Sequence, residues 1–146
     1  IKKDINKAIH YFTLSANLDN LYSQIFLGHI YYQKRYVKKD VKKAIYYLSL
    51  AADQNAPEAQ YFLGRIYFNE KCYEKAIYYF NQAAKKSYSP AQLFLGYIYL
   101  FGGNDHLNIN KSIHYLSLAA NNGNFEAQYI IGIIFITGKL QAFVKA

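Results

Sequence analysis

The side chains of this chain best suited to catalysis or metal binding are four histidines and a single cysteine. His10 and His114 occupy equivalent places in two similar stretches, where other copies of the stretch have tyrosine. No histidine pair has the spacing of metal ligands, and no nucleophile is paired with a histidine base. Cys72 lies beside Lys71 and Lys75, which favours reactivity, but an exposed structural thiol is the simpler interpretation. We therefore expect no catalytic residue, no metal ligand, no cofactor and no enzymatic activity.

Tyrosine and phenylalanine offer the chemistry of recognition instead. The 146 residues include 17 Tyr and 10 Phe, with no Trp or Met. A hydrophobic content of 53% is too high for a disordered chain. No apolar run reaches the roughly 18 to 20 residues that cross a bilayer. The composition favours a folded domain whose surface binds another molecule.

The charge balance permits several classes of partner. With 17 Lys and Arg against 9 Asp and Glu, the net charge of +8 suits nucleic acid, anionic lipid or an acidic protein. Arginine occurs only at Arg35 and Arg65, and a lysine-rich surface favours solvated charge over base-specific contacts. The lysines cluster in loops and at helix starts: Lys2, Lys3, Lys7, Lys38, Lys39, Lys42, Lys43, Lys71, Lys75, Lys85 and Lys86.

One pattern recurs along the chain and positions most of the aromatic residues. Each copy has a glycine after an apolar residue, with spacings of 36, 32 and 36 residues between Gly28, Gly64, Gly96 and Gly132. A glutamine precedes each glycine by four residues, and an aromatic residue follows it by three. A second stretch begins with a small residue, followed by tyrosine three positions on: Ala8, Ala44, Ala76 and Ser112 begin it. Apolar residues at this spacing predict amphipathic helices, and a period of roughly 20 to 50 residues predicts a solenoid.

Each copy thus contains a first helix, which carries the glycine, and a second helix, which carries the small residue. We expect helices over residues 5–17, 22–33, 40–53, 57–69, 73–86, 90–101, 109–121 and 125–137. Asp4, Asp40 and Asn108 are placed to cap second helices. Left-handed residues are expected after the second helices, at Asp19, Asn55, Ser87 and Gly123. Pro57 and Pro90 fall in first turns, where a missing N–H is harmless.

The length fits one domain, and we expect a single repeat domain over 1–146. Its parts are the second helix of a partial repeat at 5–20, repeats at 21–56, 57–88 and 89–124, and a partial repeat at 125–146. Because the chain begins on a second helix and Gln141–Ala146 lead into a further repeat, we expect a fragment of a longer solenoid. An uncapped end of such an array exposes an apolar face, here expected around Ile133, Ile134 and Ile136.

The pattern A-x-Y-x-L-G-x-x-Y, a loop, and then D-x-x-K-A-x-x-Y-x-x-A-A-x-x-G resembles the Sel-one-like repeat (SLR) family. Ala59–Gly64 with Tyr67 match its first half, and Asp40 with Lys43 and Ala44 match its second half. This resemblance covers essentially the whole chain. It implies an all-α fold, a right-handed helix–turn–helix repeat solenoid related to tetratricopeptide repeats, with about eight helices. It also implies a non-enzymatic scaffold or adaptor that binds other proteins.

The chain departs from the family pattern in two ways. The turn glycines between the two helices are mostly absent, and only Gly102 and Gly138 remain. The copy that begins at Ala59 has a loop four residues shorter than the others, so we expect a local change in superhelical twist there.

First helices line the concave face of such solenoids, and their outward positions predict a groove rich in aromatic residues. The expected partner-binding residues are Tyr22, His29, Tyr32, Tyr61, Arg65, Phe68, Tyr97, Phe101 and Tyr129. Aromatic side chains give a large contact area at low entropic cost. Two alternatives stay open: several rings pack between neighbouring copies, or Arg65 only pairs with Glu58 or Glu70.

The sequence thus predicts an interaction module that captures a peptide or helix of a partner protein, with the lysines steering an acidic partner. The alternative function is a sequence-tolerant binder of single-stranded nucleic acid or another polyanion through the lysine-rich edge. The chain shows neither a signal peptide nor a membrane-spanning run, so we expect a soluble protein. Its compartment and oligomeric state stay open.

Overall fold

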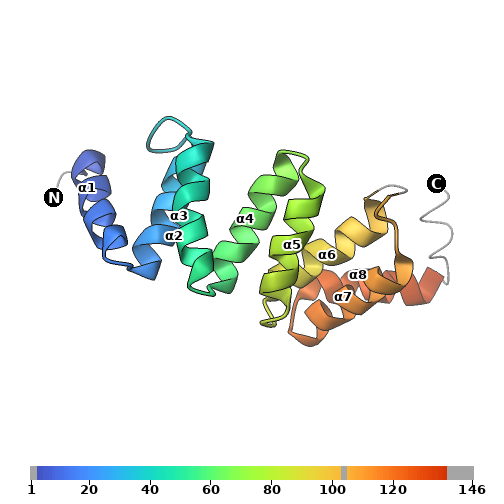
Figure 1. Ribbon diagram of the computed structural model, residues 1–146. Coiled ribbons are helices and arrows are strands. Elements are labelled where there is room, and N and C mark those ends of the chain that lie inside the picture. Colours follow the sequence, from blue (N-terminus) through green and yellow to red (C-terminus); the bar gives the residue numbers. More distant parts are fainter. Residues whose placement is uncertain (1–2, 103–104, 138–146) are drawn as a thin grey trace. The chain divides into compact units, whose positions relative to one another are not determined.

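The computed structural model describes residues 3–102 and 105–137, and these residues form helices and turns (Figure 1). The helices are α1 (Ile5–Asn17), α2 (Leu21–Tyr32), α3 (Val41–Asp53), α4 (Pro57–Asn69), α5 (Tyr73–Ala84), α6 (Ser89–Phe101), α7 (Ile109–Asn121) and α8 (Phe125–Thr137). Each boundary lies within two residues of its predicted position, which confirms the all-α fold. Gly138 and the predicted further repeat at Gln141–Ala146 lie outside the described residues.

Local capping chemistry explains why the boundaries were predictable. The side chains of Asp4, Asp40 and Asn108 each accept a hydrogen bond from the backbone N–H three residues later, at 2.9 to 3.0 Å. This bond satisfies one of the free donors of a helix start. The expected left-handed residues have φ between 59° and 82°: Asp19, Asn55, Ser87 and Gly123. Lys71 also has positive φ, at 60°, in the shortened loop before α5, which the sequence had not indicated.

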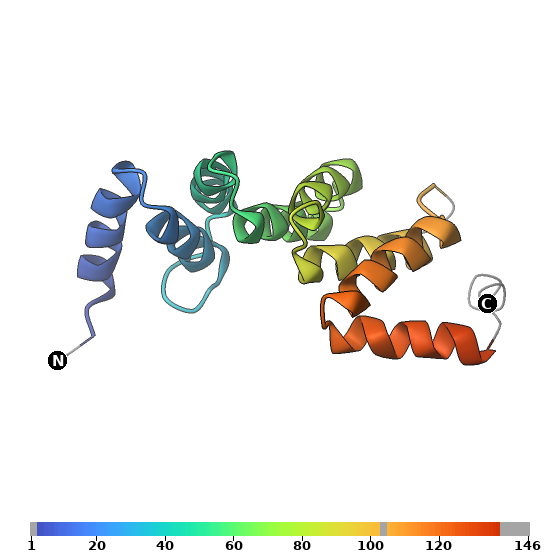
Figure 2. The same ribbon diagram turned by 90° about the horizontal axis from the view of Figure 1, so that it is seen from below.

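Contacts divide the chain within α5 into two compact units, Ile1–Ala76 and Ile77–Ala146. In the first unit, α2 packs against α1 and α3, and α3 packs against α4. In the second unit, α7 packs against both α6 and α8, as Figure 2 shows. Each helix therefore contacts mainly its neighbours along the chain, as in a repeat protein.

The repeat glycines let first and second helices approach closely. A Cβ placed on Gly28 would lie 2.4 Å from Leu48 Cγ, and one on Gly96 would lie 2.6 Å from Leu116 Cγ. Both leucines are almost completely buried. Ser112 at the start of α7 adds a hydrogen bond from its hydroxyl to the Gly96 carbonyl, at 2.8 Å. The backbone of each first helix thus forms a notch that the leucine of the second helix fills.

The aromatic residues three positions after Gly28 and Gly96 have a structural role. Tyr31 of α2 stacks on Tyr47 of α3 with centroids 6.0 Å apart, and Tyr99 of α6 stacks on Tyr115 of α7 at 5.8 Å. A lysine from the first turn of the second helix lies over the same first-helix ring, at 5.0 Å for Lys43 and 5.2 Å for Lys111. These rings are therefore packing residues within each copy.

The repeated glutamine joins consecutive helices. Gln24 and Gln92 are buried, and each donates from its amide to a carbonyl in the last turn of the preceding helix, at 3.2 Å. Each also accepts a hydrogen bond from the residue that ends the following second helix, Gln54 at 2.8 Å and Asn122 at 2.9 Å. Burying a polar amide is costly unless its atoms are hydrogen-bonded, and here both the amide nitrogen and the amide oxygen of each glutamine have a partner.

We expect Gly96→Ala to lower the free energy of unfolding by about 2 kcal/mol, because the added methyl overlaps the branched, buried part of Leu116. Gly132→Ala is the matched control: among the described residues nothing lies within 4 Å of a Cβ placed there, so helix propensity alone should stabilise the protein by about 0.5 to 1 kcal/mol. Urea unfolding of both variants followed by circular dichroism measures the difference. Equal effects of the two changes would contradict the close packing described at Gly96.

Candidate partner-binding clefts

Two clefts lie between consecutive first helices, one between α2 and α4 in the first unit and one between α6 and α8 in the second. Residues at the same repeat positions line both. The corresponding pairs are His29 and Tyr97, Tyr32 and Leu100, Gln33 and Phe101, Phe62 and Ile130, Arg65 and Ile133, and Ile66 and Ile134. The two clefts therefore have equivalent positions in the repeat, but the lining of the first includes more polar side chains than the lining of the second.

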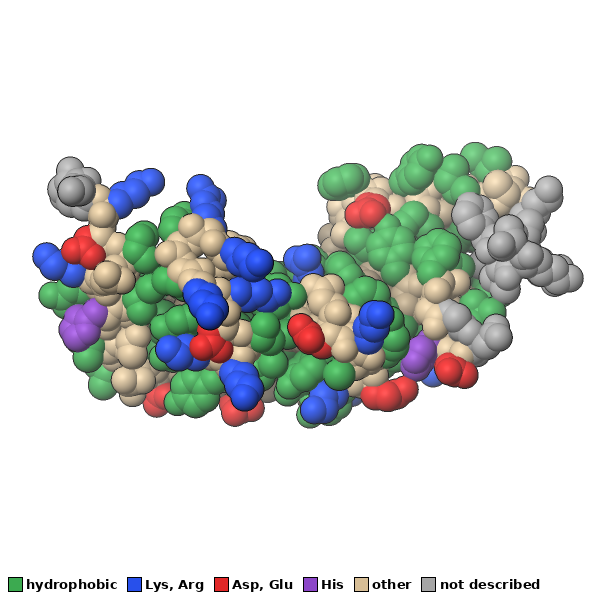
Figure 3. All heavy atoms as spheres, turned by 90° about the horizontal axis from the view of Figure 1, so that it is seen from above, with side chains coloured by type: hydrophobic (Ala, Val, Ile, Leu, Met, Phe, Trp, Pro, Cys, Tyr) green, Lys and Arg blue, Asp and Glu red, His purple; other side chains and the backbone are tan. Residues whose placement is uncertain are grey.

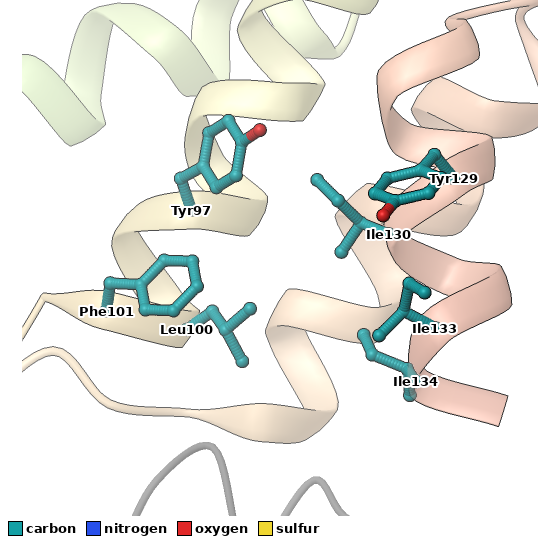
Figure 4. Close-up of a pocket in the computed structure, with 7 residues that line it drawn as sticks. All are labelled: Tyr97, Leu100, Phe101, Tyr129, Ile130, Ile133 and Ile134. Carbon is teal, nitrogen blue, oxygen red and sulfur yellow. The ribbon is translucent and has the colours of Figure 1, made fainter. Parts of the chain in front are cut away.

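The cleft between α6 and α8 has a volume of about 280 Å³ and an apolar lining. Figure 4 shows Tyr97, Leu100 and Phe101 of α6 facing Tyr129, Ile130, Ile133 and Ile134 of α8. Leu100 and Ile134 are buried and Ile130 and Ile133 are half-buried, whereas the aromatic rim is open, with Phe101 59% and Tyr129 70% exposed. A concave apolar surface of this size accepts a bulky apolar side chain.

Tyr97 closes one edge of this cleft. Its hydroxyl donates a hydrogen bond to the Glu126 carboxylate, which links α6 to the first turn of α8. Burial, together with the hydrogen bond to Glu126 and the negative charge of that carboxylate, raises the pKa of Tyr97 to about 12. Its ring lies 6.1 Å from that of Phe101. The hydroxyl of Tyr97 is thus hydrogen-bonded to Glu126 at the edge of the cleft, while its ring forms part of the apolar wall.

The cleft between α2 and α4 has a volume of about 240 Å³ and a different chemistry. The ring of His29 meets Phe62 edge to face with centroids 4.0 Å apart. Burial lowers the pKa of His29, and the charge of Arg65 lowers it further, although Glu58 opposes the shift. The imidazole is therefore favoured in its neutral form, with one donor and one acceptor nitrogen.

Tyr32 forms the outer wall of the same cleft. Its hydroxyl accepts a hydrogen bond from the Asn69 amide at 2.8 Å, and the Lys39 ammonium lies 4.2 Å from the centre of its ring. With the exposed Arg65 opposite, the cleft presents two cations near a half-buried aromatic ring. This arrangement suits a polar or acidic group better than an aliphatic one.

The structure groups six of the nine predicted site residues into the two clefts. His29, Tyr32 and Arg65 line the first, and Tyr97, Phe101 and Tyr129 line the second. The predicted site residues are tyrosines, phenylalanines, one histidine and one arginine, so they do not include the aliphatic residues of the second cleft. The available signal was the composition of α8, whose sequence FEAQYIIGIIFIT is apolar on nearly every face.

The other three predicted residues line neither cleft. Tyr22 is 80% exposed at the start of α2, and the half-buried Phe68 packs edge to face against Tyr73, at 5.5 Å. Tyr61 is only 9% exposed, so little of its side chain reaches the surface of the predicted groove. Arg65 follows one helical turn after Tyr61. Its guanidinium lies over the Tyr61 ring, 5.8 Å from the ring centre.

Basic side chains gather on the surface around the loop between α2 and α3, on the face of the first unit seen in Figure 3. Several lysines of the first unit lie over tyrosine rings, including Lys39 of this loop over Tyr32 and Lys75 of α5 over Tyr67, the latter at 5.2 Å. Across the described ranges 3–102 and 105–137, no cluster of His, Cys, Asp and Glu is suited to holding a metal ion. No helix within those ranges has the length and apolar character needed to cross a membrane.

Comparison with known proteins identifies the repeat. The Sel1 repeat family matches residues 1–20, 21–55, 57–88 and 89–124. A crystal structure of a Sel1 repeat protein from Oxalobacter formigenes is similar, with a TM-score of 0.83 and 27% identity over 95% of this chain and 58% of that one. A crystal structure of c5321, a protective antigen of uropathogenic Escherichia coli with an SLR fold, has a TM-score of 0.79 and 24% identity over 88% of this chain and 29% of that one. The chain thus spans less than two thirds of either structure. Comparison with curated protein sequences found no match.

The family assignment rests on agreement between sequence and structure. Three of the matched ranges, 21–55, 57–88 and 89–124, each contain one repeat glycine and one helix pair, and residues 1–20 contain the second helix α1. Sel1 repeats generally serve as protein–protein interaction modules and as non-catalytic scaffolds. This chain belongs to the Sel1 repeat family.

Proposed function

We propose that this chain is a non-enzymatic adaptor that binds a peptide or helix of a partner protein, with a bulky apolar side chain of the partner in the α6/α8 cleft. The observation that carries this proposal is the apolar cleft of about 280 Å³ with an exposed aromatic rim. Burial of one large apolar side chain contributes about 1.5 to 3 kcal/mol, and such anchors dominate the energy of interfaces.

The α2/α4 cleft is a second contact in this proposal. Arg65 and Lys39 would attract an acidic group of the same partner, while Tyr32 and His29 offer hydrogen-bonding atoms. Surface lysines would accelerate association with an acidic partner more than they would strengthen the final complex. We also propose that the chain forms a single repeat domain and that Tyr22, Tyr61 and Phe68 belong to its partner-binding surface.

Binding of single-stranded nucleic acid is the competing function. The net charge of +8 favours it, and the exposed lysines and tyrosines supply the required chemistry. Against it, no Lys or Arg lines the apolar cleft, and several lysines of the first unit lie over tyrosine rings. The two functions differ in their dependence on salt, because release of counterions makes polyanion binding weaken steeply as salt rises.

Selection from a random peptide display library at high salt and with nuclease should enrich sequences that share a large aliphatic or aromatic residue. We expect Ile133→Lys to lower the affinity for the selected peptides at least about tenfold, because it places a charge against the apolar lining of the cleft. Phe101→Ser should lower this affinity by a smaller factor, since Phe101 lies on the rim. Isothermal titration with one selected peptide measures the affinities.

Tyr78→Ser is the matched control, because Tyr78 is 58% exposed, close to the 59% of Phe101, and does not line the cleft. It should leave the affinity unchanged. The proposal fails if enriched peptides lack an apolar anchor, or if Ile133→Lys and Tyr78→Ser act alike. Binding of oligothymidylate that high salt abolishes, together with no peptide selected, would instead support the polyanion function.

The Tyr97 hydroxyl should remain protonated well above the ordinary tyrosine pKa of about 10, because its own pKa is about 12. Since the folded-state pKa is raised, the stabilising contribution is fully present below about pH 10 and is lost as pH rises towards 12. Nuclear magnetic resonance of ring-labelled tyrosine, assigned with Tyr97→Phe, follows this titration. Glu126→Gln should lower the pKa, and titration of Tyr97 together with free tyrosine would contradict the described hydrogen bond.

A further inference from the structure

The loop between α2 and α3, residues 33–40, begins a segment that concentrates the positive charge of the chain. Residues 34–43 include six of the 17 basic residues and one of the 9 acidic residues, so these ten positions carry a net charge of +5 out of +8. The acidic residue, Asp40, caps α3 and accepts a hydrogen bond from the Lys43 backbone N–H at 3.0 Å. In the described part of the chain, no ion pair joins any of the six cations to a carboxylate. Their charge is therefore available to an anionic partner.

The α2–α3 loop projects from the helices that carry it. Figure 1 shows it as a wide arc beyond the last turn of α2 and the first turn of α3. Residues 34–39 surround an open hollow of about 350 Å³, and four of these six residues are cationic and exposed: Lys34, Arg35, Lys38 and Lys39. A projecting arc with cations on both sides of its tip can meet a flat charged surface without any groove.

Two less polar residues lie at the centre of the arc. Tyr36 is 44% exposed and Val37 is half-buried, with two cations before them and two after them in the sequence. The Arg35 guanidinium lies 5.2 Å from the centre of the Tyr36 ring. A tyrosine flanked by basic side chains is suited to the boundary between lipid headgroups and hydrocarbon, because its ring is apolar and its hydroxyl is polar.

The charge of the first unit differs between the two ends of α2 and α3. The α2–α3 loop lies at one end, and the turns 17–22 and 53–58 lie at the other, where the Gln54 amide donates to the Asp19 carbonyl at 3.1 Å. These two turns contain three carboxylates and neither Lys nor Arg. An anionic surface therefore attracts one end of the helices and repels the other, which directs the α2–α3 loop toward that surface.

An anionic bilayer fits these features better than nucleic acid or an acidic peptide does. Five of the six cations are lysines, which act as point charges and not as a fork that matches one phosphate or carboxylate. Stacking of nucleic-acid bases needs open ring faces, but Lys39 lies 4.2 Å from the centre of the Tyr32 ring and Lys43 lies 5.0 Å from that of Tyr31. A bilayer needs neither feature, because its headgroups attract each cation separately.

We propose that the α2–α3 loop docks this chain on the surface of an anionic bilayer. The cations of residues 34–39 lie among the lipid phosphates, and Tyr36 lies at the level of the headgroups. Each cation near such a surface strengthens association about fivefold, so the docking is reversible and weakens as salt rises. This surface belongs to the first unit, and its use does not depend on a partner peptide in the α6/α8 cleft of the second unit.

Because the chain contains no Trp, Tyr36→Trp provides a single fluorescent reporter at the tip of the loop. Its emission should shift to shorter wavelength with vesicles of phosphatidylcholine that contain about 30% phosphatidylserine, and it should not shift with phosphatidylcholine alone. Leu18→Trp is the matched control, because Leu18 is 83% exposed in the turn 17–22 at the opposite end of α2. Its emission should stay unchanged with both kinds of vesicle.

Sedimentation with the same vesicles measures the partition coefficient of the chain. Lys34→Gln combined with Lys38→Gln should lower it at least about tenfold, and neither residue lines the α2/α4 cleft. Lys85→Gln combined with Lys86→Gln removes the same charge from the turn after α5 and should lower it less than about twofold. Circular dichroism checks that each variant folds.

The proposal is overturned if phosphatidylserine vesicles leave the Tyr36→Trp emission unchanged, if both kinds of vesicle bind equally, or if the two double variants act alike. Binding of oligothymidylate through Lys34 and Lys38, without binding to vesicles, would overturn it and assign the loop to nucleic acid. Release from vesicles by about 10 mM inorganic phosphate at constant ionic strength would overturn it in favour of a site for free phosphate.

Discussion

The close approach of the two helices within each copy is the contact on which the rest of the structure depends. Because Gly28 and Gly96 have no side chain, Leu48 and Leu116 pack directly against the helix backbone. This proximity brings Tyr31 against Tyr47 and Tyr99 against Tyr115, and it brings the lysines of the second helices over the same first-helix rings. The outward residues of the first helices are thereby held on rigid elements, where they form the two clefts.

The two clefts illustrate how repeat proteins vary their binding chemistry. The inward positions keep small or apolar residues, such as Ala44, Gly96 and Leu116, because a change there disturbs two helices at once. The outward positions carry no such constraint, so Arg65 in one copy corresponds to Ile133 in another. The surface of the repeat can therefore diverge while its interior remains fixed.

The helices were predictable because their signals are local. Capping side chains such as Asp40 act within one turn, and left-handed residues such as Asn55 follow directly from the end of a helix. The site was less predictable, because exposure depends on neighbours in space. The helical-face rule placed Tyr61 on the surface, yet the side chain of Arg65 covers it. The same rule could not show that Leu100 and Ile134 form the floor of a cleft, since this depends on the packing of α6 near α8.

The repeated glutamines have a consequence for how such a chain comes apart. Gln24 joins the carbonyl end of α1 to the end of α3, and Gln92 joins the end of α5 to the end of α7. If a terminal helix detaches, the buried amide loses a partner and its neighbour becomes less stable. Unfolding of one copy is therefore coupled to the next by hydrogen bonding as well as by apolar contact. An array built in this way resists fraying one helix at a time and tends to melt as a cooperative block.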